Sequence, residues 1–186
     1  MKRSRLGNVG VVGFGTPAPI LLPPRGSRPG LAAVRELLES GVAPDGQRDA
    51  GGLAAALERI APLARRTGLV AIISDFRGQT NWSGPLAAVR GRHTVVAFDI
   101  SDPREAELPA VGRVAMVDPE SGERLVLDTS SRRVRRRFEA LERERREALA
   151  TELVRLRVPH IALGTENDWL IALARGLEAA RVRERR

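Results

Sequence analysis

Apolar and polar residues in the first third of the chain have the spacing of a hairpin followed by two helices. Short β-branched and apolar runs at 9–14 and 20–22 are each ended by glycine or proline, and they predict strands. Because few residues separate them, we expect antiparallel pairing, since a parallel partner would need a long crossover. Apolar residues at helical spacing then predict helices over 28–40 and 53–67, joined by a polar, glycine-rich loop over 42–52.

The most continuous apolar run in the chain is Leu69–Ile73, and it stops abruptly at Ser74 and Asp75. Because such a run is typical of a strand buried on both faces, it predicts a central parallel strand. A short helix over 85–89 and a strand over 93–100 follow. This alternation predicts an α/β fold, with a doubly wound, mostly parallel sheet and helices on both faces.

The second half of the chain departs from this alternation. An apolar stripe interrupted only by Arg145 predicts one long helix, and two short apolar runs around a turn sequence predict a hairpin inserted before it. A last strand and a last helix are expected after the long helix. The expected ranges are 113–117 and 124–127 for the hairpin with its turn over 118–122, 131–157 for the long helix, 159–163 for the strand and 169–180 for the last helix.

The composition is that of one globular domain, and it excludes several classes of chemistry. The chain has 186 residues, of which 42% are hydrophobic and 29% are charged, so we expect a single domain over 1–186. The absence of cysteine excludes disulfides, thiolate catalysis and cysteine-ligated metals. No apolar run is long enough to span a bilayer, and the N-terminal residues lack the pattern of an export signal, so we expect a cytoplasmic location.

A formal net charge of +8 raises the question of a nucleic-acid partner. Five of the six residues over 132–137, at the start of the long helix, are arginines. Glu139, Glu142, Glu144 and Glu147 lie within helical reach of arginines, which favours a solvated, self-neutralised face. Aromatic residues are only 3% of the chain, so bases would find few stacking partners. Nucleic acid is therefore a disfavoured partner, and non-specific binding through this helix is the alternative function.

Other features that resemble catalytic or cofactor motifs lack the context that the chemistry requires. Residues 13–18 have the pattern G-x-G-x-x-A, but the prolines within and after it exclude the helix that would receive a pyrophosphate. His93 and His160 have no neighbouring cysteine or carboxylate at ligand spacing, so a structural role is favoured for both. Neither Ser83 nor Ser101 has the local signature of an activated nucleophile. We therefore expect no enzymatic activity and no cofactor.

Four short sequence phrases, taken in order, resemble a known family. These phrases are Ile72-Ile73-Ser74-Asp75-Phe76, then Asp99 with the run from Asp102 to Pro109, then Val117-Asp118-Pro119, and finally Asn167-Asp168-Trp169-Leu170. They are similar to the domain of unknown function 58 family, over about Leu6 to Leu177. The resemblance implies a von Willebrand factor A-like fold and an association with MoxR-type AAA+ ATPases.

The resemblance also implies a metal-ion-dependent adhesion site, of which this chain keeps one ligand. Asp75 matches the family's last aspartate, whereas the family's threonine would fall near Gly51, where there is no hydroxyl. The Asp-x-Ser-x-Ser strand should precede Leu6, so we expect a degenerate site that binds Mg²⁺ only if the missing ligands are supplied. That missing strand would lie between the strands that begin at Val9 and Leu69, whose unpaired edges would be free to join two copies in a homodimer.

We therefore predict a non-catalytic protein–protein interaction module that resembles the partner of a MoxR-type ATPase. Its docking face should lie at the rim that carries Asp75, which is also the one expected metal ligand. Both tryptophans, Trp82 and Trp169, are expected to pack, but Trp82 would suit a binding hot spot if it were exposed. The residues expected to bind the partner are Ser74, Asp75, Trp82, Asp99, Asp102, Arg104 and Glu105.

Overall fold

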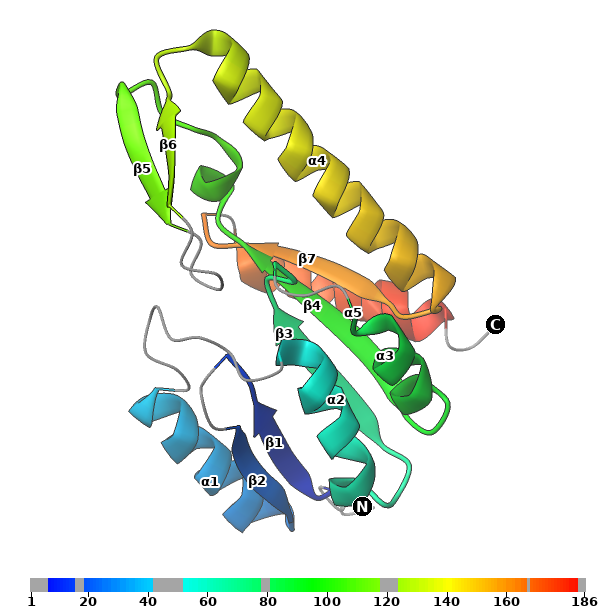
Figure 1. Cartoon of the computed structure of the whole chain (residues 1–186). Helices are drawn as coiled ribbons and strands as arrows, with labels where there is room; N and C mark the ends of the chain where they lie inside the picture. The colour runs from blue at the N-terminus through cyan, green and yellow to red at the C-terminus, as the bar shows by residue number, and fades with distance from the viewer. Residues whose placement is uncertain are drawn as a thin grey trace. The chain divides into compact units, whose positions relative to one another are not determined.

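The computed structural model describes six segments of the chain: residues 7–15, 19–41, 52–77, 81–117, 124–166 and 168–183. These residues fall into two compact units. The first unit contains the N-terminal hairpin and three helices, and the second contains a parallel sheet, a second hairpin and two further helices (Figure 1). No helix within these segments is both long enough and apolar enough to cross a membrane.

The first unit is built on the antiparallel hairpin that the short strand separation predicted. Its elements are β1 (Val9–Gly13), β2 (Ile20–Arg25), α1 (Ser27–Ser40), α2 (Gly52–Leu63) and α3 (Ser83–Arg90). Helix α1 contacts both strands of the hairpin, and α2 contacts β1. Leu53 and Leu57, four residues apart on α2, are both buried, as their helical spacing predicted.

Strand β2 is longer than the sequence predicted. We expected it to end at Leu22, but it continues through Pro23 and Pro24 to Arg25. The register of the hairpin shifts opposite these prolines, so they lie at a bulge, where a missing N–H donor breaks no regular ladder. A Cβ on Gly10 would lie 2.7 Å from the Leu22 carbonyl oxygen and 2.9 Å from the Pro24 nitrogen. Glycine at this position therefore permits the bulge.

The second unit contains the parallel sheet that the apolar runs predicted. Its strands, with β4 in the middle, are β3 (Leu69–Ser74), β4 (Thr94–Ser101) and β7 (His160–Gly164). Helix α5 (Trp169–Arg183) packs on one face of this sheet. Val96, Ile161 and Leu163 form a buried apolar core there, and Leu173 of α5 packs against it. The α/β prediction is therefore confirmed for this part of the chain.

The inserted hairpin and the long helix are also confirmed. These elements are η1 (Pro103–Ala106), β5 (Arg113–Val117), β6 (Arg124–Asp128) and α4 (Arg132–Arg155). Strands β5 and β6 pair antiparallel, and α4 contacts β7 and η1. The short helix η1 was not predicted; the Asp102 carboxylate caps it by accepting from the Arg104 amide at 2.9 Å. The turn predicted over 118–122, and all of the loop predicted over 42–52 except Gly52, lie outside the described residues.

Strand β3 forms as predicted, but the prediction that both of its faces are buried is wrong. Ile72 is buried, whereas Leu69 and Ile73 are 67% and 65% exposed. Among the described residues β3 pairs only with β4, and the apolar core beneath α5 centres on β4 and β7. The apolar side chains on one face of β3 are therefore left uncovered.

We expect Gly176 to be required for the contact between α5 and β7. A Cβ on this residue would lie 2.6 to 2.9 Å from side-chain carbons of Ile161. Gly176→Ala should lower the free energy of unfolding by about 1–2 kcal/mol, although alanine is the better helix former. Urea unfolding followed by circular dichroism measures the change. The loss should shrink in an Ile161→Ala background, and an equal loss in both backgrounds would contradict the contact.

Candidate functional site

Three loops meet at the carboxyl end of the parallel sheet because its strands run in the same direction. Asp75 follows β3, Asp102 follows β4 and Glu166 follows β7. The Nε atom of Arg104 lies 2.9 Å from a carboxylate oxygen of Glu166, which joins the second loop to the third. We call Asp75, Asp102, Arg104, Glu105 and Glu166 the charged rim. Four of these residues were predicted from the strand ends, and Glu166 was not.

Side-chain hydrogen bonds fix the turn that follows β3. The Ser74 hydroxyl accepts from the Phe76 amide at 3.0 Å, and the Asp75 carboxylate accepts from the Arg77 amide at 3.1 Å. Phe76 has a φ of 51°, in the left-handed region that is unfavourable for a bulky residue, and its side chain is buried. This turn leaves Asp75 exposed at the rim. The predicted positions of Ser74 and Asp75 at the strand end are therefore confirmed.

An ion-pair cluster attaches this turn to α4. Arg77 donates from both terminal nitrogens to the two carboxylate oxygens of Glu142, each at 3.1 Å. The same carboxylate lies 3.4 Å from Nε of Arg145, and Nε of Arg77 lies 3.3 Å from Glu105. The Glu142 side chain is only 13% exposed, so its bidentate pair is shielded from solvent and from salt. We call Arg77, Glu105, Glu142 and Arg145 the Glu142 cluster.

Arg145 is a site residue that the sequence prediction missed. Its Nη1 donates to the backbone carbonyl oxygens of Asp75 and Phe76, at 3.4 and 3.5 Å. Arg145 is also the residue that interrupts the apolar stripe of the long helix. That interruption is the signal that marks it, because a charged residue on an inward face requires a polar partner. The stripe alone does not identify the partner.

Asp99 was predicted to face a partner from the rim, and this prediction is wrong. Asp99 is 5% exposed because its side chain projects from within β4, whereas Asp102 lies beyond the strand end. Its Oδ2 lies 3.3 Å from Nε2 of His160, and its Oδ1 has no hydrogen-bond partner among the described residues. His160 therefore has a carboxylate neighbour that its surroundings in the sequence do not show.

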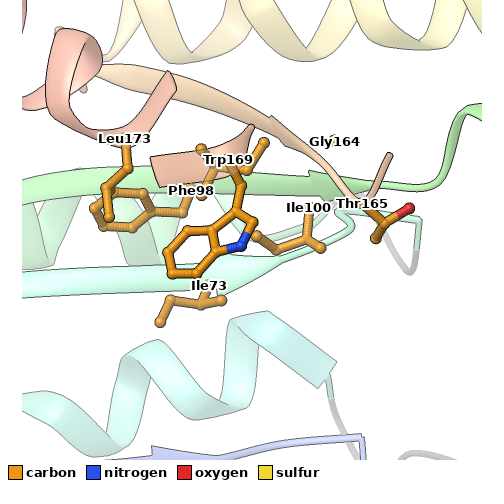
Figure 2. Close-up of a pocket in the computed structure, with 8 residues that line it drawn as sticks. Ile73, Phe98, Ile100, Gly164, Thr165, Trp169 and Leu173 are labelled. Atoms are coloured by element: carbon orange, nitrogen blue, oxygen red, sulfur yellow. The ribbon is translucent and has the colours of Figure 1, made fainter. Parts of the chain in front are cut away.

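The exposed tryptophan is Trp169 and not Trp82. Trp82 is only 6% exposed, so a partner cannot reach its side chain, and the prediction that it binds the partner is wrong. Trp169 was expected to pack, but it is 50% exposed and lines an apolar pocket of about 410 Å³ (Figure 2). The pocket is lined by Ile73, Phe98, Ile100, Leu163, Gly164, Thr165, Trp169 and Leu173.

The residues around Asp75 do not fit a complete Mg²⁺ site. Mg²⁺ requires several oxygen ligands in near-octahedral geometry. Within the described segments there is no group of three or more His, Asp or Glu residues arranged to hold a metal ion. One carboxylate oxygen of Asp75 accepts from the Arg77 amide, and the guanidinium of Arg145 donates to the Asp75 carbonyl oxygen. Among the described residues, the side-chain carboxylate and the backbone carbonyl of Asp75 thus both accept hydrogen bonds from N–H donors.

The comparisons with known proteins identify the family. A family model described as "Protein of unknown function DUF58" matches residues 3–148. The chain belongs to this family. It is 35% identical over 139 residues to the uncharacterized protein MAV169 of Mycobacterium avium, a match that covers 75% of the chain and 80% of that protein. It is 37% identical over 141 residues to the uncharacterized protein Rv1480 of Mycobacterium tuberculosis, covering 75% of the chain and 43% of that longer protein.

A solved structure supports the architecture of this DUF58 chain. The crystal structure of the conserved hypothetical protein BatB from Bacteroides thetaiotaomicron matches it with a TM-score of 0.51, over 94% of the chain and 79% of BatB. The two sequences are 14% identical in this comparison, so the likeness concerns the fold alone. It agrees with a mixed α/β fold that contains a three-stranded parallel sheet.

Removing the charge of Glu142 should release the loop after β3. We expect Glu142→Gln to lower the free energy of unfolding by about 1–3 kcal/mol, because two shielded guanidinium groups lose their shared carboxylate. The control is Glu39→Gln, which breaks the exposed pair with Arg35 and should cost at most about 0.5 kcal/mol. Urea unfolding measures both variants. Equal losses in the two variants would show that the Glu142 cluster does not stabilise the site.

Proposed function

We propose that this DUF58 chain is a non-catalytic protein–protein interaction module that docks its partner on the charged rim. The observation that carries the proposal is the attachment of the rim to the Glu142 cluster. Arg77 and Arg145 hold the loop that bears Asp75 against a carboxylate from α4, so the exposed charge stands on a fixed support. A preorganised surface loses less conformational entropy when a partner binds.

Charged and apolar surface occur together near the carboxyl ends of the strands. Asp75, Arg104 and Glu105 are exposed and differ in sign, and charge patterns of this kind favour specific partners over non-specific ones. Trp169 is half exposed beside a pocket that Ile73 of β3 also lines. A tryptophan next to a polar rim is the composition common in binding hot spots. This combination supports a protein partner.

We propose a MoxR-type AAA+ ATPase as that partner, in the cytoplasm, and a von Willebrand factor A-like arrangement of the fold. The support for these proposals is membership of the DUF58 family and the resemblance of the phrases around Asp75 and Asp102. The proposal requires no catalysis and no metal at the rim. Mg²⁺ would bind at Asp75 only if ligands from outside the described residues completed the site.

Charge reversal at the rim tests the docking face. A variant that combines Asp75→Lys, Asp102→Lys and Arg104→Glu should bind a purified MoxR-type ATPase of the same organism at least about 10-fold more weakly, because like charges would then face each other. Isothermal titration calorimetry with the full chain measures the Kd. Titrations in Mg²⁺ and in EDTA should give the same Kd.

The matched control combines Glu36→Lys, Glu58→Lys and Arg66→Glu. These three residues are exposed outside the rim, and the substitutions change the net charge by the same amount. The control should bind like the unaltered chain, and circular dichroism should show that both variants are folded. Equal weakening in both variants, or no effect of reversal at the rim, would rule out the proposed face.

We also propose that the edge of β3 that has no partner strand among the described residues allows two copies to associate. Leu69, Ala71 and Ile73 form an exposed apolar face along a strand that, within the described segments, pairs on one side only. Sedimentation velocity should detect a dimer, and Ala71→Lys should raise its Kd at least about 10-fold, because a charge on an edge strand opposes edge-to-edge pairing. The control is Ala87→Lys on the exposed side of α3. A monomer at every concentration would contradict this mode.

A further inference from the structure

Four arginines on the first turns of α4 have no partner in the part of the chain that the structure describes. The side chains of Arg132, Arg133, Arg136 and Arg137 are all exposed, and none of these side chains forms a hydrogen bond or an ion pair with another described residue. The spacing of the glutamates predicted a self-neutralised face. The exposure of these side chains agrees with the solvated face that was predicted, and its neutralisation by the glutamates stays a prediction.

The ion pairs that α4 does form lie farther along the helix. Glu142 is occupied by Arg77 and Arg145, and Glu152 is occupied by Arg155. Asp128 is the last residue of β6, the strand before α4, and its carboxylate accepts hydrogen bonds from Ser130. Hydrogen bonds from the hydroxyl and then the amide of Ser130 lower the pKa of Asp128. The contacts of Glu142 and Asp128 described here are thus with residues other than the four arginines.

The four side chains are arranged in two pairs along the helix. Arg132 and Arg136 are four residues apart, as are Arg133 and Arg137, so each pair spans one turn and is separated by roughly 6 Å along the axis. The remaining arginine of the run, Arg135, has a different role. Its Nη1 donates to the backbone carbonyl oxygens of Thr129 and Ser130. The cluster is thus a two-by-two group of guanidinium groups that have no side-chain partner among the described residues, beside one anchoring arginine.

The residue that anchors this cluster is buried and hydrogen-bonded. Thr129 is fully buried, and its amide and its hydroxyl both donate to the Gly112 carbonyl oxygen, at 2.7 and 2.8 Å. The Thr129 hydroxyl also accepts from the Val111 amide at 3.1 Å. These bonds tie the base of the β5–β6 hairpin to the residues just before α4 (Figure 1). The four exposed arginines therefore follow directly after a buried, hydrogen-bonded residue.

We infer that this cluster binds the phosphate backbone of duplex nucleic acid. Guanidinium groups pair with phosphate oxygens, and the release of counterions from the duplex drives binding that does not depend on sequence. No aromatic residue shares the exposed side of these turns, so base stacking in single strands is not favoured. Val134 lies between the arginines and Phe138 follows them, and both are partly buried, so these first turns expose little of the apolar surface that enters a bilayer.

A salt titration tests this assignment, which concerns a surface and a ligand other than those of the proposed function. Fluorescence anisotropy of a labelled mixed-sequence duplex, titrated with the full chain, measures the binding constant over a KCl series. Four phosphate contacts should give a slope of about −3.6 for log K against log salt, or roughly 150-fold weaker binding on going from about 50 to 200 mM. Arg136→Gln alone should reduce the magnitude of the slope by about 1. Changing all four arginines to glutamine should abolish the binding.

The matched control changes four exposed arginines outside α4 to glutamine: Arg28, Arg65, Arg66 and Arg92. It removes the same net charge and should keep the affinity and the slope, so an equal loss in both quadruple variants would overturn the proposal. Two other polyanions complete the test: vesicles of phosphatidylcholine and phosphatidylglycerol in equal amounts, and polyglutamate. Binding to either one as tight as to the duplex would overturn the assignment, as would the absence of duplex binding at low salt.

Discussion

The parallel pairing of β4 with β3 and β7 is the interaction on which the candidate site depends. The register places Ser74 beside Asp99 and Ser101 beside Gly164, so the three strands end close together. Because the strands run in one direction, the loops that follow them share one edge of the sheet. Arg104 and Glu166 are 62 residues apart in sequence and meet only for this reason.

Helix α4 divides its charges between two environments. Glu142 and Arg145, in its middle, lie in a partly buried setting where each charge requires a partner, and the structure supplies those partners from the loop after β3. Arg132, Arg133, Arg136 and Arg137 of its first turns are exposed to water, where a charge without an ion-pair partner among the described residues costs little free energy. One helix therefore stabilises the rim with one set of charged residues and leaves a second set available to a ligand.

The contacts around Asp75 can be compared with those expected of a metal-ion-dependent adhesion site. Backbone amides and an arginine contact the turn that carries this aspartate, and the described residues include no group of three or more His, Asp or Glu side chains arranged to hold a metal ion. In the proposed docking mode, a basic group of the partner meets the exposed carboxylate directly. The rim then binds through ion pairs and an apolar anchor, and not through a bridging cation.

The sequence by itself determined most of the elements, because strand and helix periodicity and turn chemistry are local properties, and its phrases indicated the family. It placed β3, the β5–β6 hairpin and α4 correctly, and it located Asp75 at a strand end. Only the tertiary structure decided that Asp99 is buried against His160, that Trp169 is exposed and that Arg145 holds the loop after β3. Periodicity shows which residues share a face, but burial and pairing depend on segments distant in sequence that come to cover that face.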